Sequence, residues 1–436
     1  MFVSLIRHPG FVIGVAVAVA APAAGMIPAP QDASGLPIAS AAPVPVAKPK
    51  PKKRPPRFVF TFEGRGFGHG VGMSQYGAYG AARAGRSAQA IIAHYYRGTS
   101  LAVLPLTPVR IVLGPGASRV RLNANGPWGV IAENTPLQIV RPLPPGAEVT
   151  VTRSGTAIVV TDANGAELLK ASGPIRFAPG NAQTTTSFRG ARYRGGLRIL
   201  PEGSKLTVVN HVDLEQYLLG VVPKEMPSRW GDDAPAALEA QAIAARSYAM
   251  ATKRSGDVFD MYADERSQVY GGATAEDPRT SRAVAATAGQ VVTQNGAIVT
   301  TFFFSTSGGR TENVENVFRG GPRSYLVSVN DAAFDVLSPH HVWRDPKTFT
   351  DAALARRIGL KSPVRTIKVL QRGASPRVKL VRFVARNGTF KEMRGTEVRR
   401  LLGLRDSWFV PRRRVLTPAT LRLVTASRAP NGASTS

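Results

Sequence analysis

The sequence predicts an α+β fold with a mixed, mostly antiparallel β core, a few helices and an inserted β-rich segment. Residues 101–200 contain short Val- and Ile-rich runs separated by Gly and Pro, which is typical of strands joined by turns. Residues 203–255 contain one strand-like run, followed by two stretches with helical spacing of apolar side chains. Residues 346–410 alternate between helical and strand patterns again.

The first 25 residues have the pattern of a secretory signal peptide. Arg7 and His8 precede an apolar run from Phe11 to Ala20, which is followed by Ala21-Pro22-Ala23. A cationic start, a short apolar stretch and small-x-small sites are the parts of such a signal. The apolar run is well short of the ~20 residues that a membrane-spanning helix needs. We therefore expect a secreted or cell-envelope protein without stable membrane insertion after signal cleavage; an uncleaved anchor is the alternative.

The charge balance favours a polyanionic partner. The chain has 56 Lys and Arg against 28 Asp and Glu, a formal net charge of +28. Such a field attracts nucleic acid, anionic lipid or an acidic wall polymer, although it can also serve solubility alone. Export, and the lack of any nucleic-acid-binding motif, argue against nucleic acid as the partner. The chain has no Cys, which excludes disulfides, thiolate metal sites and cysteine nucleophiles.

Residues 26–57 are predicted to be a Pro- and Ala-rich basic linker. Its last part places basic side chains between prolines, namely Lys48, Lys50, Lys52, Lys53, Arg54 and Arg57. Such a composition stays extended, at ~3.1 Å per residue where it is polyproline-like. The segment is either a tether that adheres to an anionic wall or an inert spacer, and the sequence favours neither.

The globular part is predicted to cover residues 58–412, with a partly disordered tail over 413–436. Within it, residues 101–200 are a β-rich insertion or subdomain, and residues 203–345 are the core in which we expect the functional site. Helices are predicted over 88–95 and over 235–252. A hairpin over 290–294 and 297–304 is predicted about Asn295-Gly296, since this dipeptide is typical of two-residue turns.

Alternating glycines from Gly64 to Gly72 are predicted to continue a strand at the start of the globular part. The run has neither the Gly-Lys pair of a phosphate loop nor the register of a dinucleotide-binding loop. A strand with Gly at every second position has one bare face. Either a polymer lies along that face, or the face packs tightly against the core. The opposite face would present Arg65, Phe67, His69 and Val71.

Glu225 is a candidate general acid. Asp213 has the position of a helix N-cap, and Pro223 is expected to end that helix. Glu225 would then lie in a rigid loop between Pro223 and Pro227, with apolar neighbours that raise the pKa of a carboxyl, as general-acid work near neutral pH requires. Taken alone, a solvated loop glutamate is the commoner case.

Five longer blocks form a recognisable set. They are Tyr217 to Pro227 (YLLGVVPKEMP), Ala240 to Ala249 (AQAIAARSYA), Ser267 to Gly272 (SQVYGG), Phe304 to Glu312 (FSTSGGRTE) and Gly66 to Ala78 (GFGHGVGMSQYGA). Together they resemble the stage II sporulation protein D family, also called the SpoIID/LytB domain. Residues 372–409 fit the same pattern, so the resemblance covers most of residues 58–412.

The resemblance implies a lytic transglycosylase that cleaves peptidoglycan glycan strands stripped of their stem peptides. The family's essential acid is the Glu of the Glu-Met-Pro block, here Glu225. One carboxyl suffices, because the muramoyl 6-hydroxyl closes a 1,6-anhydro ring in place of water. A hydrolase would need a second carboxylate ~5–9.5 Å away, and no second loop acid stands out. The alternative is a non-catalytic, wall-binding amidase enhancer, which would not need Glu225.

A denuded strand is a regular polyanion, because each muramic acid exposes a lactyl carboxylate. The residues expected to bind it are Arg246 and Arg310 for carboxylates, and Gln268, Tyr270, Ser305, Ser307, His69, Ser74 and Gln75 for hydroxyls and sugar rings. Structural roles are the alternatives: a solvated helix charge for Arg246, and a plain turn for Ser305 and Ser307.

Two features depart from the family. Some relatives bind zinc through Cys and His; since this chain has no Cys and its histidines are scattered, we expect no metal and no cofactor. The block from Gly66 to Ala78 normally closes the domain but opens it here, as in a circular permutation. We therefore expect Phe60–Gly72 to pair within the core sheet and the N-terminus to leave the body near Arg412. His69, Ser74 and Gln75 should then approach the groove that holds Glu225. The expected partners are peptidoglycan glycan strands, with a cell-wall amidase as a further candidate.

Overall fold

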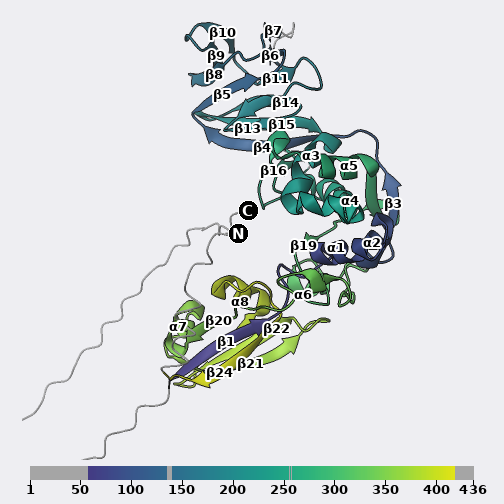
Figure 1. The fold of residues 1–436 in the computed structure, drawn as a ribbon. Coiled ribbons are helices and arrows are strands. Elements are labelled where there is room, and N and C mark those ends of the chain that lie inside the picture. Colours follow the sequence, from purple (N-terminus) through teal and green to yellow (C-terminus); the bar gives the residue numbers. More distant parts are fainter. Residues whose placement is uncertain (1–56, 135–139, 255, 257, 418–436) are drawn as a thin grey trace, which may run out of the picture. The chain divides into compact units, whose positions relative to one another are not determined.

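The computed structural model describes residues 57–134, 140–254, 256 and 258–417 (Figure 1). In these ranges the chain has the predicted α+β fold, with eight α-helices and mostly antiparallel sheets built around three hydrophobic clusters. No helix within these ranges combines the length and the apolarity that a membrane crossing requires. The predicted signal peptide 1–25 and the linker up to residue 56 lie outside the described residues.

Two sheets make up the β-rich part of the chain. One has the strand order β10-β9-β8-β5-β12-β13, and the other has the order β16-β4-β15-β14-β11-β6-β7. The strands are β4 (Pro108–Ala117), β5 (Arg119–Ala124), β6 (Trp128–Ala132), β7 (Val140–Leu143), β8 (Val149–Ser154), β9 (Ala157–Asp162), β10 (Glu167–Ala171), β11 (Ile175–Pro179), β12 (Thr186–Phe188), β13 (Ala191–Tyr193), β14 (Gly196–Glu202), β15 (Lys205–Asp213) and β16 (Met261–Tyr262). Among these described strands only β16 pairs in parallel, with β4.

The β-rich part is continuous with the core that follows it. β14 crosses the boundary expected at residue 200 and pairs with β15, so the seven-stranded sheet takes strands from both sides of that boundary. One hydrophobic cluster contains both Val151 of β8 and Tyr217 of the next helix. The segment 101–200 is therefore not packed as a separate insertion.

Six helices form a group around α4; α1 and α2 precede the β-rich part in the sequence, and α3 to α6 follow β15. They are α1 (Gln75–Arg83), α2 (Ala88–Tyr95), α3 (Leu214–Glu225), α4 (Pro235–Thr252), α5 (Pro278–Ala286) and α6 (Val314–Val317), with 3-10 turns η1 (Ser228–Asp232), η2 (Gly272–Ala275) and η3 (Asp335–Leu337). The predicted helices over 88–95 and 235–252 occur with those bounds. α4 packs against α1, α2, α3 and α5, which makes it the central helix of this group.

α3 begins as predicted but does not end as predicted. The Asp213 carboxylate accepts from the N–H of Glu215 over 2.8 Å and caps the helix. Pro223 was expected to stop the helix, yet α3 continues to Glu225. A proline removes its own N–H from the ladder and crowds the carbonyl four residues earlier, but it leaves the later N–H groups free to bond. The N–H of Met226 bonds to the carbonyl of Val222 over 3.0 Å. Glu225 is therefore the last helical residue and not a loop residue.

The predicted hairpin is present but shorter. β17 (Gln290–Gln294) pairs with β18 (Ala297–Ile298) and with β3 (Ser100–Val103). Asn295 and Gly296 both have positive φ, 52° and 79°, as the two central residues of a type I′ turn require. Phe303–Phe304, expected at the end of the second hairpin strand, forms β19 and pairs in parallel with β2 (Met73–Ser74) instead.

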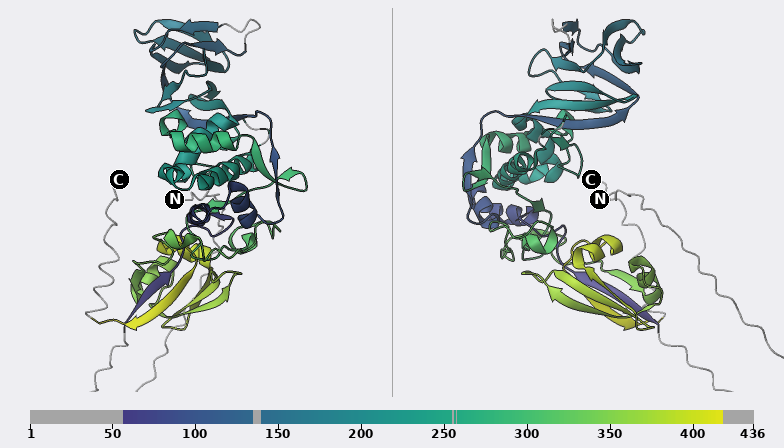
Figure 2. Two further views of the ribbon diagram at one scale, coloured as in Figure 1. Left: turned by 45° about the vertical axis from the view of Figure 1, so that its right-hand side comes forward. Right: turned by 180° about the vertical axis from the view of Figure 1, so that it is seen from behind.

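The C-terminal part contains two small sheets and two helices. Its elements are β1 (Phe58–Gly64), β20 (Lys347–Thr350), α7 (Asp351–Ile358), β21 (Val364–Arg372), β22 (Val378–Ala385), β23 (Phe390–Arg394), α8 (Gly395–Leu402) and β24 (Phe409–Val415). The N-terminal strand β1, purple in Figure 2, lies between β20 and β24 and pairs antiparallel with both. The Cα partners of Thr61 are Thr348 and Arg412, so the chain enters this sheet close to Arg412 as predicted. Of the predicted pairing of Phe60–Gly72, the part up to Gly64 occurs in this three-stranded sheet.

The boundary of the tail needs a correction. We expected the tail to start at residue 413, but β24 continues to Val415 because Arg414 and Val415 pair with Val59 and Phe58. Residues 418–436 lie outside the described part of the chain.

The glycine run is not a strand, contrary to the prediction. The φ angles of Gly66, Gly68, Gly70 and Gly72 are 79°, 130°, 87° and 75°, values that residues other than glycine rarely adopt. A Cβ at Gly70 would collide with the guanidinium of Arg377, and one at Gly72 would collide with a backbone carbonyl. Of the two interpretations of the bare glycines, tight packing against the core is therefore the one observed.

Candidate active site

Glu225 lies at the C-terminal end of α3 with its side chain partly buried. Burial raises the pKa of Glu225 from the ordinary 4.5 to about 7, and a hydrogen bond from the N–H of Val269 opposes that shift. Val269 belongs to the loop between β16 and η2, which packs against α3 because the N–H of Gly271 bonds to the carbonyl of Gly220 over 3.0 Å. The acid is thus held between a helix end and a loop, in surroundings that favour its protonated form.

The N-terminus of α1 fixes the end of α3. Gln75, the first residue of α1, donates from Nε2 to the carbonyl of Glu225 over 2.9 Å and lies 3.4 Å from Oε1 of Gln241. The hydroxyl of Ser74 caps α1 by accepting from the N–H of Gly77, and it also accepts from the N–H of Ser307. Gln75 therefore lies beside Glu225, as the sequence predicted, but its side chain contacts the backbone carbonyl of Glu225 and not the carboxyl group.

Two tyrosines next to the acid were not predicted. Burial raises the pKa of Tyr217 and of Tyr248, and the charge of Glu225 contributes to both shifts, so both hydroxyls lie near the carboxylate and stay protonated. The spacing could have revealed Tyr217, since it lies eight residues before Glu225 on α3 and so shares a helix face. Tyr248 and Gln241 are seven residues apart on α4 and therefore lie on the same face of that helix.

The site contains buried amide donors. Gln268 is 2% exposed and accepts at Oε1 from the hydroxyl of Tyr217 over 3.5 Å. Among the described residues, Nε2 of Gln268 and Nε2 of Gln241 have no hydrogen-bond partner. Buried donors are unfavourable when unpaired, so these two groups are suited to a ligand with hydroxyl or carbonyl oxygens.

The structure does not support a substrate-binding role for Arg246. Its side chain is 0% exposed. Nε and Nη2 donate to the two carboxylate oxygens of Glu215, each over 2.7 Å, and Nη1 donates to the carbonyl of Gln290 over 3.0 Å. The guanidinium thus joins α3, α4 and β17 and has no face left for a sugar carboxylate. The alternative of a solvated helix charge is also wrong.

Three other predicted binding residues are buried in structural contacts. Tyr270 is 5% exposed, and its hydroxyl donates to Asn210 over 3.0 Å, so its ring offers no platform for a sugar. Ser307 is fully buried and donates to Asp335 over 2.8 Å. Ser74 is fully buried in its capping role. These side chains shape the loops of the site without being open to a ligand.

His69 is neutral and locked in one tautomer. Nδ1 accepts from the N–H of Val71 over 3.1 Å, so the proton is on Nε2, which donates to the carbonyl of Phe303 over 3.0 Å. Burial, with the positive charges of Arg399 and Arg377, lowers the pKa of His69 to about 3. The ring therefore joins the glycine run to β19 and is not an acid or base near neutral pH.

Ser305 and Arg310 remain accessible. Ser305 is partly buried, and its carbonyl accepts from the N–H of Tyr76 over 3.0 Å, directly beside Gln75. Arg310 is exposed and donates to the hydroxyl of Ser328 over 3.0 Å. Of the predicted binding residues, Arg310 is exposed and Ser305, Gln75 and His69 are partly exposed, whereas the others are buried.

A pair of buried carboxylates, Asp331 and Asp335, supports the loop from Ser305 to Arg310, and no local pattern in the sequence predicts it. Oδ2 of Asp335 accepts from the hydroxyl of Ser307 and from the N–H groups of Gly308 and Gly309, while Oδ1 contacts Nδ1 of His341 at 2.7 Å. Asp331 accepts from the hydroxyl of Tyr95 over 2.6 Å, and burial raises its pKa to about 7.

Comparisons with known proteins show a similarity over the part of the chain that contains Glu225. Residues 202–294 match the family model described as stage II sporulation protein, SpoIID. Stage II sporulation protein D of Bacillus subtilis is 30% identical over 218 residues, which is 46% of this chain and 61% of the relative. The amidase enhancer of Bacillus subtilis is 39% identical over 114 residues, which is 26% of this chain and 15% of the relative. An uncharacterized protein of Brachyspira hyodysenteriae is 35% identical over 135 residues, or 30% of this chain and 36% of the relative.

The chain thus spans less than two thirds of the length of each of these relatives. The matched segment contains β15, α3, α4 and the loop that donates to the acid. The chain therefore carries a SpoIID-family domain, and Glu225 lies inside it.

Proposed function

We propose that the protein is a lytic transglycosylase that cleaves peptide-stripped peptidoglycan strands, with Glu225 as both acid and base. The observation that carries this proposal is the partly buried carboxyl at the end of α3, whose pKa burial raises to about 7. At neutral pH roughly half of such carboxyls hold a proton, which suits a group that must first give a proton and then take one back.

The proposed reaction uses one carboxyl in two steps. Protonated Glu225 donates its proton to the glycosidic oxygen, the bond from that oxygen to C1 of the muramoyl residue breaks, and the leaving strand departs with a hydroxyl. The carboxylate then accepts the proton of the muramoyl 6-hydroxyl while O6 forms a bond to C1. The products are a 1,6-anhydro-muramoyl end and a free strand, Glu225 is protonated again, and no water is consumed.

The surroundings of Glu225 support a single-carboxyl reaction. In the described part of the chain, burial and the Val269 hydrogen bond account for the shift in its pKa, without a contribution from a second carboxylate. A hydrolase would place a partner carboxylate within ~5–9.5 Å, and such a neighbour would add a charge effect to the pKa. An internal nucleophile such as the 6-hydroxyl removes the need for that partner.

The proposed binding groups are mostly neutral donors. Nε2 of Gln268 and Nε2 of Gln241 have no partner among the described residues and are the amide donors that we assign to the strand. Tyr217 and Tyr248 keep their protons. Arg310 is the exposed cation that we assign to a lactyl carboxylate. Secretion to the cell envelope is part of the proposal, since its substrate lies there.

A second candidate function follows from the likeness to a protein named amidase enhancer. Such a protein would bind wall strands or an amidase without cleaving strands itself. It would have no use for a carboxyl with a raised pKa, which is why we place it second.

Product analysis in water labelled with ¹⁸O distinguishes the reactions. We expect denuded strands to give 1,6-anhydro ends, each lighter by one water than a hydrolysed end and free of the label. Reducing ends that carry ¹⁸O would show hydrolysis. If the folded protein cleaves no strands but stimulates an added amidase, that result would establish the amidase-enhancer function.

A further inference from the structure

The six-stranded sheet presents a polar face that the proposed reaction does not use. On β5, Val120, Leu122 and Ala124 are buried, whereas the alternate residues point to the other side. Cross-strand pairing places Arg121 beside Thr150, Asn123 beside Ser187, and Ser187 beside Arg192. Paired residues share a face of a sheet. We call this set, with Arg119, the polar face: Arg119, Arg121, Asn123, Thr150, Ser187 and Arg192.

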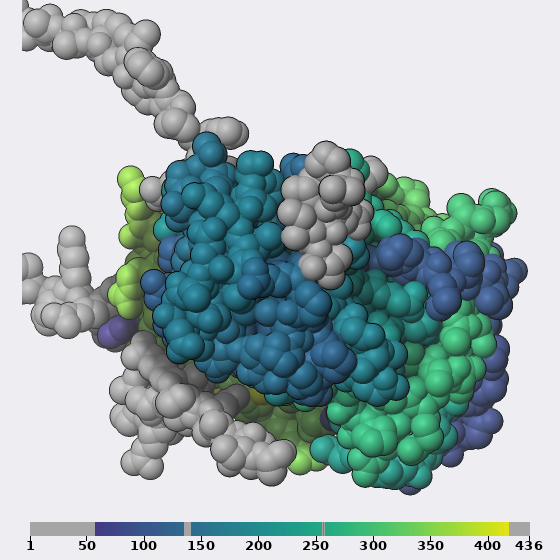
Figure 3. Space-filling model, turned by 90° about the horizontal axis from the view of Figure 1, so that it is seen from above, coloured from purple at the N-terminus to yellow at the C-terminus, as the bar shows by residue number. Residues whose placement is uncertain are grey.

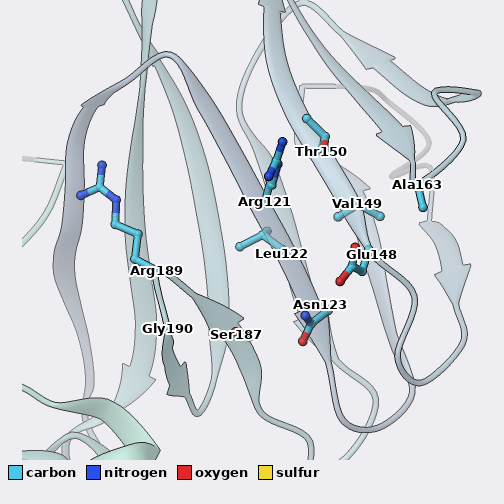
Figure 4. A pocket seen from close by; sticks show the side chains of 10 residues that line it. All are labelled: Arg121, Leu122, Asn123, Glu148, Val149, Thr150, Ala163, Ser187, Arg189 and Gly190. Atoms are coloured by element: carbon cyan, nitrogen blue, oxygen red, sulfur yellow. The ribbon is translucent and has the colours of Figure 1, made fainter.

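A cavity of about 450 Å³ lies on this face. Figure 4 shows the residues around it, which come from β5, from β8 and the turn before it, from the turn after β9, and from β12 and the turn that follows it. Arg121 and Arg189 supply positive charge, Asn123, Thr150 and Ser187 supply neutral hydrogen-bonding groups, and Glu148 is the single acid. In Figure 3 the β-rich part of the chain forms the blue surface nearest the viewer.

The arginines of this region are not neutralised. Among the described residues, Arg119, Arg121, Arg189 and Arg192 form no ion pair with a carboxylate. Other arginines of the β-rich part do have such partners, for example Arg198 with Glu133 at 2.6 Å. Unpaired guanidinium groups around a cavity are suited to an anionic ligand.

Arg189 has an unfavourable backbone conformation. Its φ is 51°, and with Gly190 at 80° it forms the two-residue turn between β12 and β13. Asn, Asp or Gly normally occupies the first position of this turn, because a larger side chain is strained there. The guanidinium lies over the ring of Phe188, with 5.1 Å between its central carbon and the ring centroid. Strain of this kind often marks a position kept for binding.

We propose that the polar face and its cavity are a second binding site for the glycan strand, in which Arg121 and Arg189 hold carboxylates of the strand. This inference rests on the proposed function for the identity of its ligand. Sugar hydroxyls match Asn123, Thr150 and Ser187, and Glu148 can accept a hydroxyl but would repel a densely charged polymer. A polyol phosphate, which carries more charge and fewer hydroxyls, therefore fits the cavity less well.

The first test measures binding without turnover, so every protein in it also carries Glu225→Gln, and the protein with that change alone stands for the wild type. The variant Arg121→Thr/Arg189→Gly removes both charges, and Arg365→Ala/Arg400→Ala removes two exposed arginines elsewhere as a matched control. At low salt the Kd for denuded strands should rise about tenfold in the first variant and less than twofold in the control. With strands whose lactyl carboxylates have been reduced to alcohols, the wild type and the first variant should bind equally. An unchanged Kd in the first variant, or tighter binding of a polyol phosphate than of the strand, would overturn the proposal.

A second measurement separates binding from folding. Arg189→Gly should raise the Tm or leave it unchanged, because Gly relieves the strain at this position; a clear drop in Tm would mean that Arg189 is kept for stability. Failure of the proposed function would look different. Arg121-dependent binding without cleavage would contradict only the transglycosylase assignment, whereas normal cleavage with an unchanged Kd in the double variant would contradict only the second site.

Discussion

The side-chain amide of Gln75 donates to the backbone carbonyl of Glu225 over 2.9 Å and joins two residues that are 150 positions apart in the sequence. This bond ties the start of α1 to the end of α3. The last carbonyls of a helix lack partners within the helix, so the bond replaces one that α3 cannot supply. It therefore sets the position of the proposed acid without touching its carboxyl group.

Gln75→Ala should lower kcat/KM on denuded strands by about tenfold to a hundredfold, because a small displacement of the acid weakens proton transfer. The Tm should change little, since one partly exposed hydrogen bond contributes only about 1 kcal/mol. Gln371→Ala, at an exposed position of β21, is the control. Unchanged kcat/KM in Gln75→Ala would show that α1 does not position the acid.

The raised pKa of Glu225 predicts the shape of the pH profile. Since cleavage starts from the protonated carboxyl, kcat/KM should fall by about tenfold per pH unit above a midpoint near 7. Measurements between pH 5 and 9 at constant ionic strength would locate this limb. A limb near the ordinary value of 4.5 would contradict the assignment of a buried acid.

The same pKa predicts how stability depends on pH. The folded state raises the pKa of Glu225 above its ordinary 4.5, so the charged form is disfavoured in the folded protein. Wild type should therefore match Glu225→Gln in stability at pH 4, lose stability relative to it as the pH rises from about 4.5 to about 7, and change little relative to it at higher pH. The difference should reach about 1–3 kcal/mol at pH 8–9. Urea unfolding of both proteins at several pH values tests this prediction. A difference in the free energy of unfolding that does not change with pH would refute it.

Arg246→Ala should destabilise the fold by about 3–5 kcal/mol, because it removes one partner of a buried ion pair and leaves Glu215 without its guanidinium. Arg266→Ala is a suitable comparison, since its pair with Asp264 is exposed and should contribute at most about 1 kcal/mol. Urea unfolding measures both. A small effect of Arg246→Ala on stability, with a large effect on glycan affinity, would restore the substrate-binding role that the sequence suggested.

The local patterns of the sequence predicted much of the fold. The helix over 88–95, the cap at Asp213 and the turn at Asn295-Gly296 are set by nearby residues, and all three occur. The prediction of a strand for the glycine run was wrong, because groups far along the chain determine its backbone conformation. The guanidinium of Arg377, for example, fills the space beside Gly70. No local pattern contains that information.

The site residues also divide into those that nearby sequence predicts and those whose role depends on contacts far along the chain. Glu225 was predicted as the acid because its motif and its apolar neighbours lie close in the sequence, and the raised pKa of its carboxyl is consistent with that prediction. Arg246 and Tyr270 were assigned to the ligand because their side chains are suited to carboxylates and sugars, but each has a buried partner far along the chain, Glu215 and Asn210. Long-range pairing of this kind decides whether a polar side chain is open to a ligand or part of the core.

The most direct test of the account is the rate at which Glu225→Gln cleaves denuded glycan strands at pH 7, with Glu167→Gln as an exposed control. Glutamine keeps the shape of the protonated side chain but cannot give or take the proton. We predict that formation of 1,6-anhydro ends falls by at least ~10²-fold in Glu225→Gln, while Glu167→Gln matches wild type. Wild-type rates in Glu225→Gln would contradict the assignment of Glu225 as the acid and base.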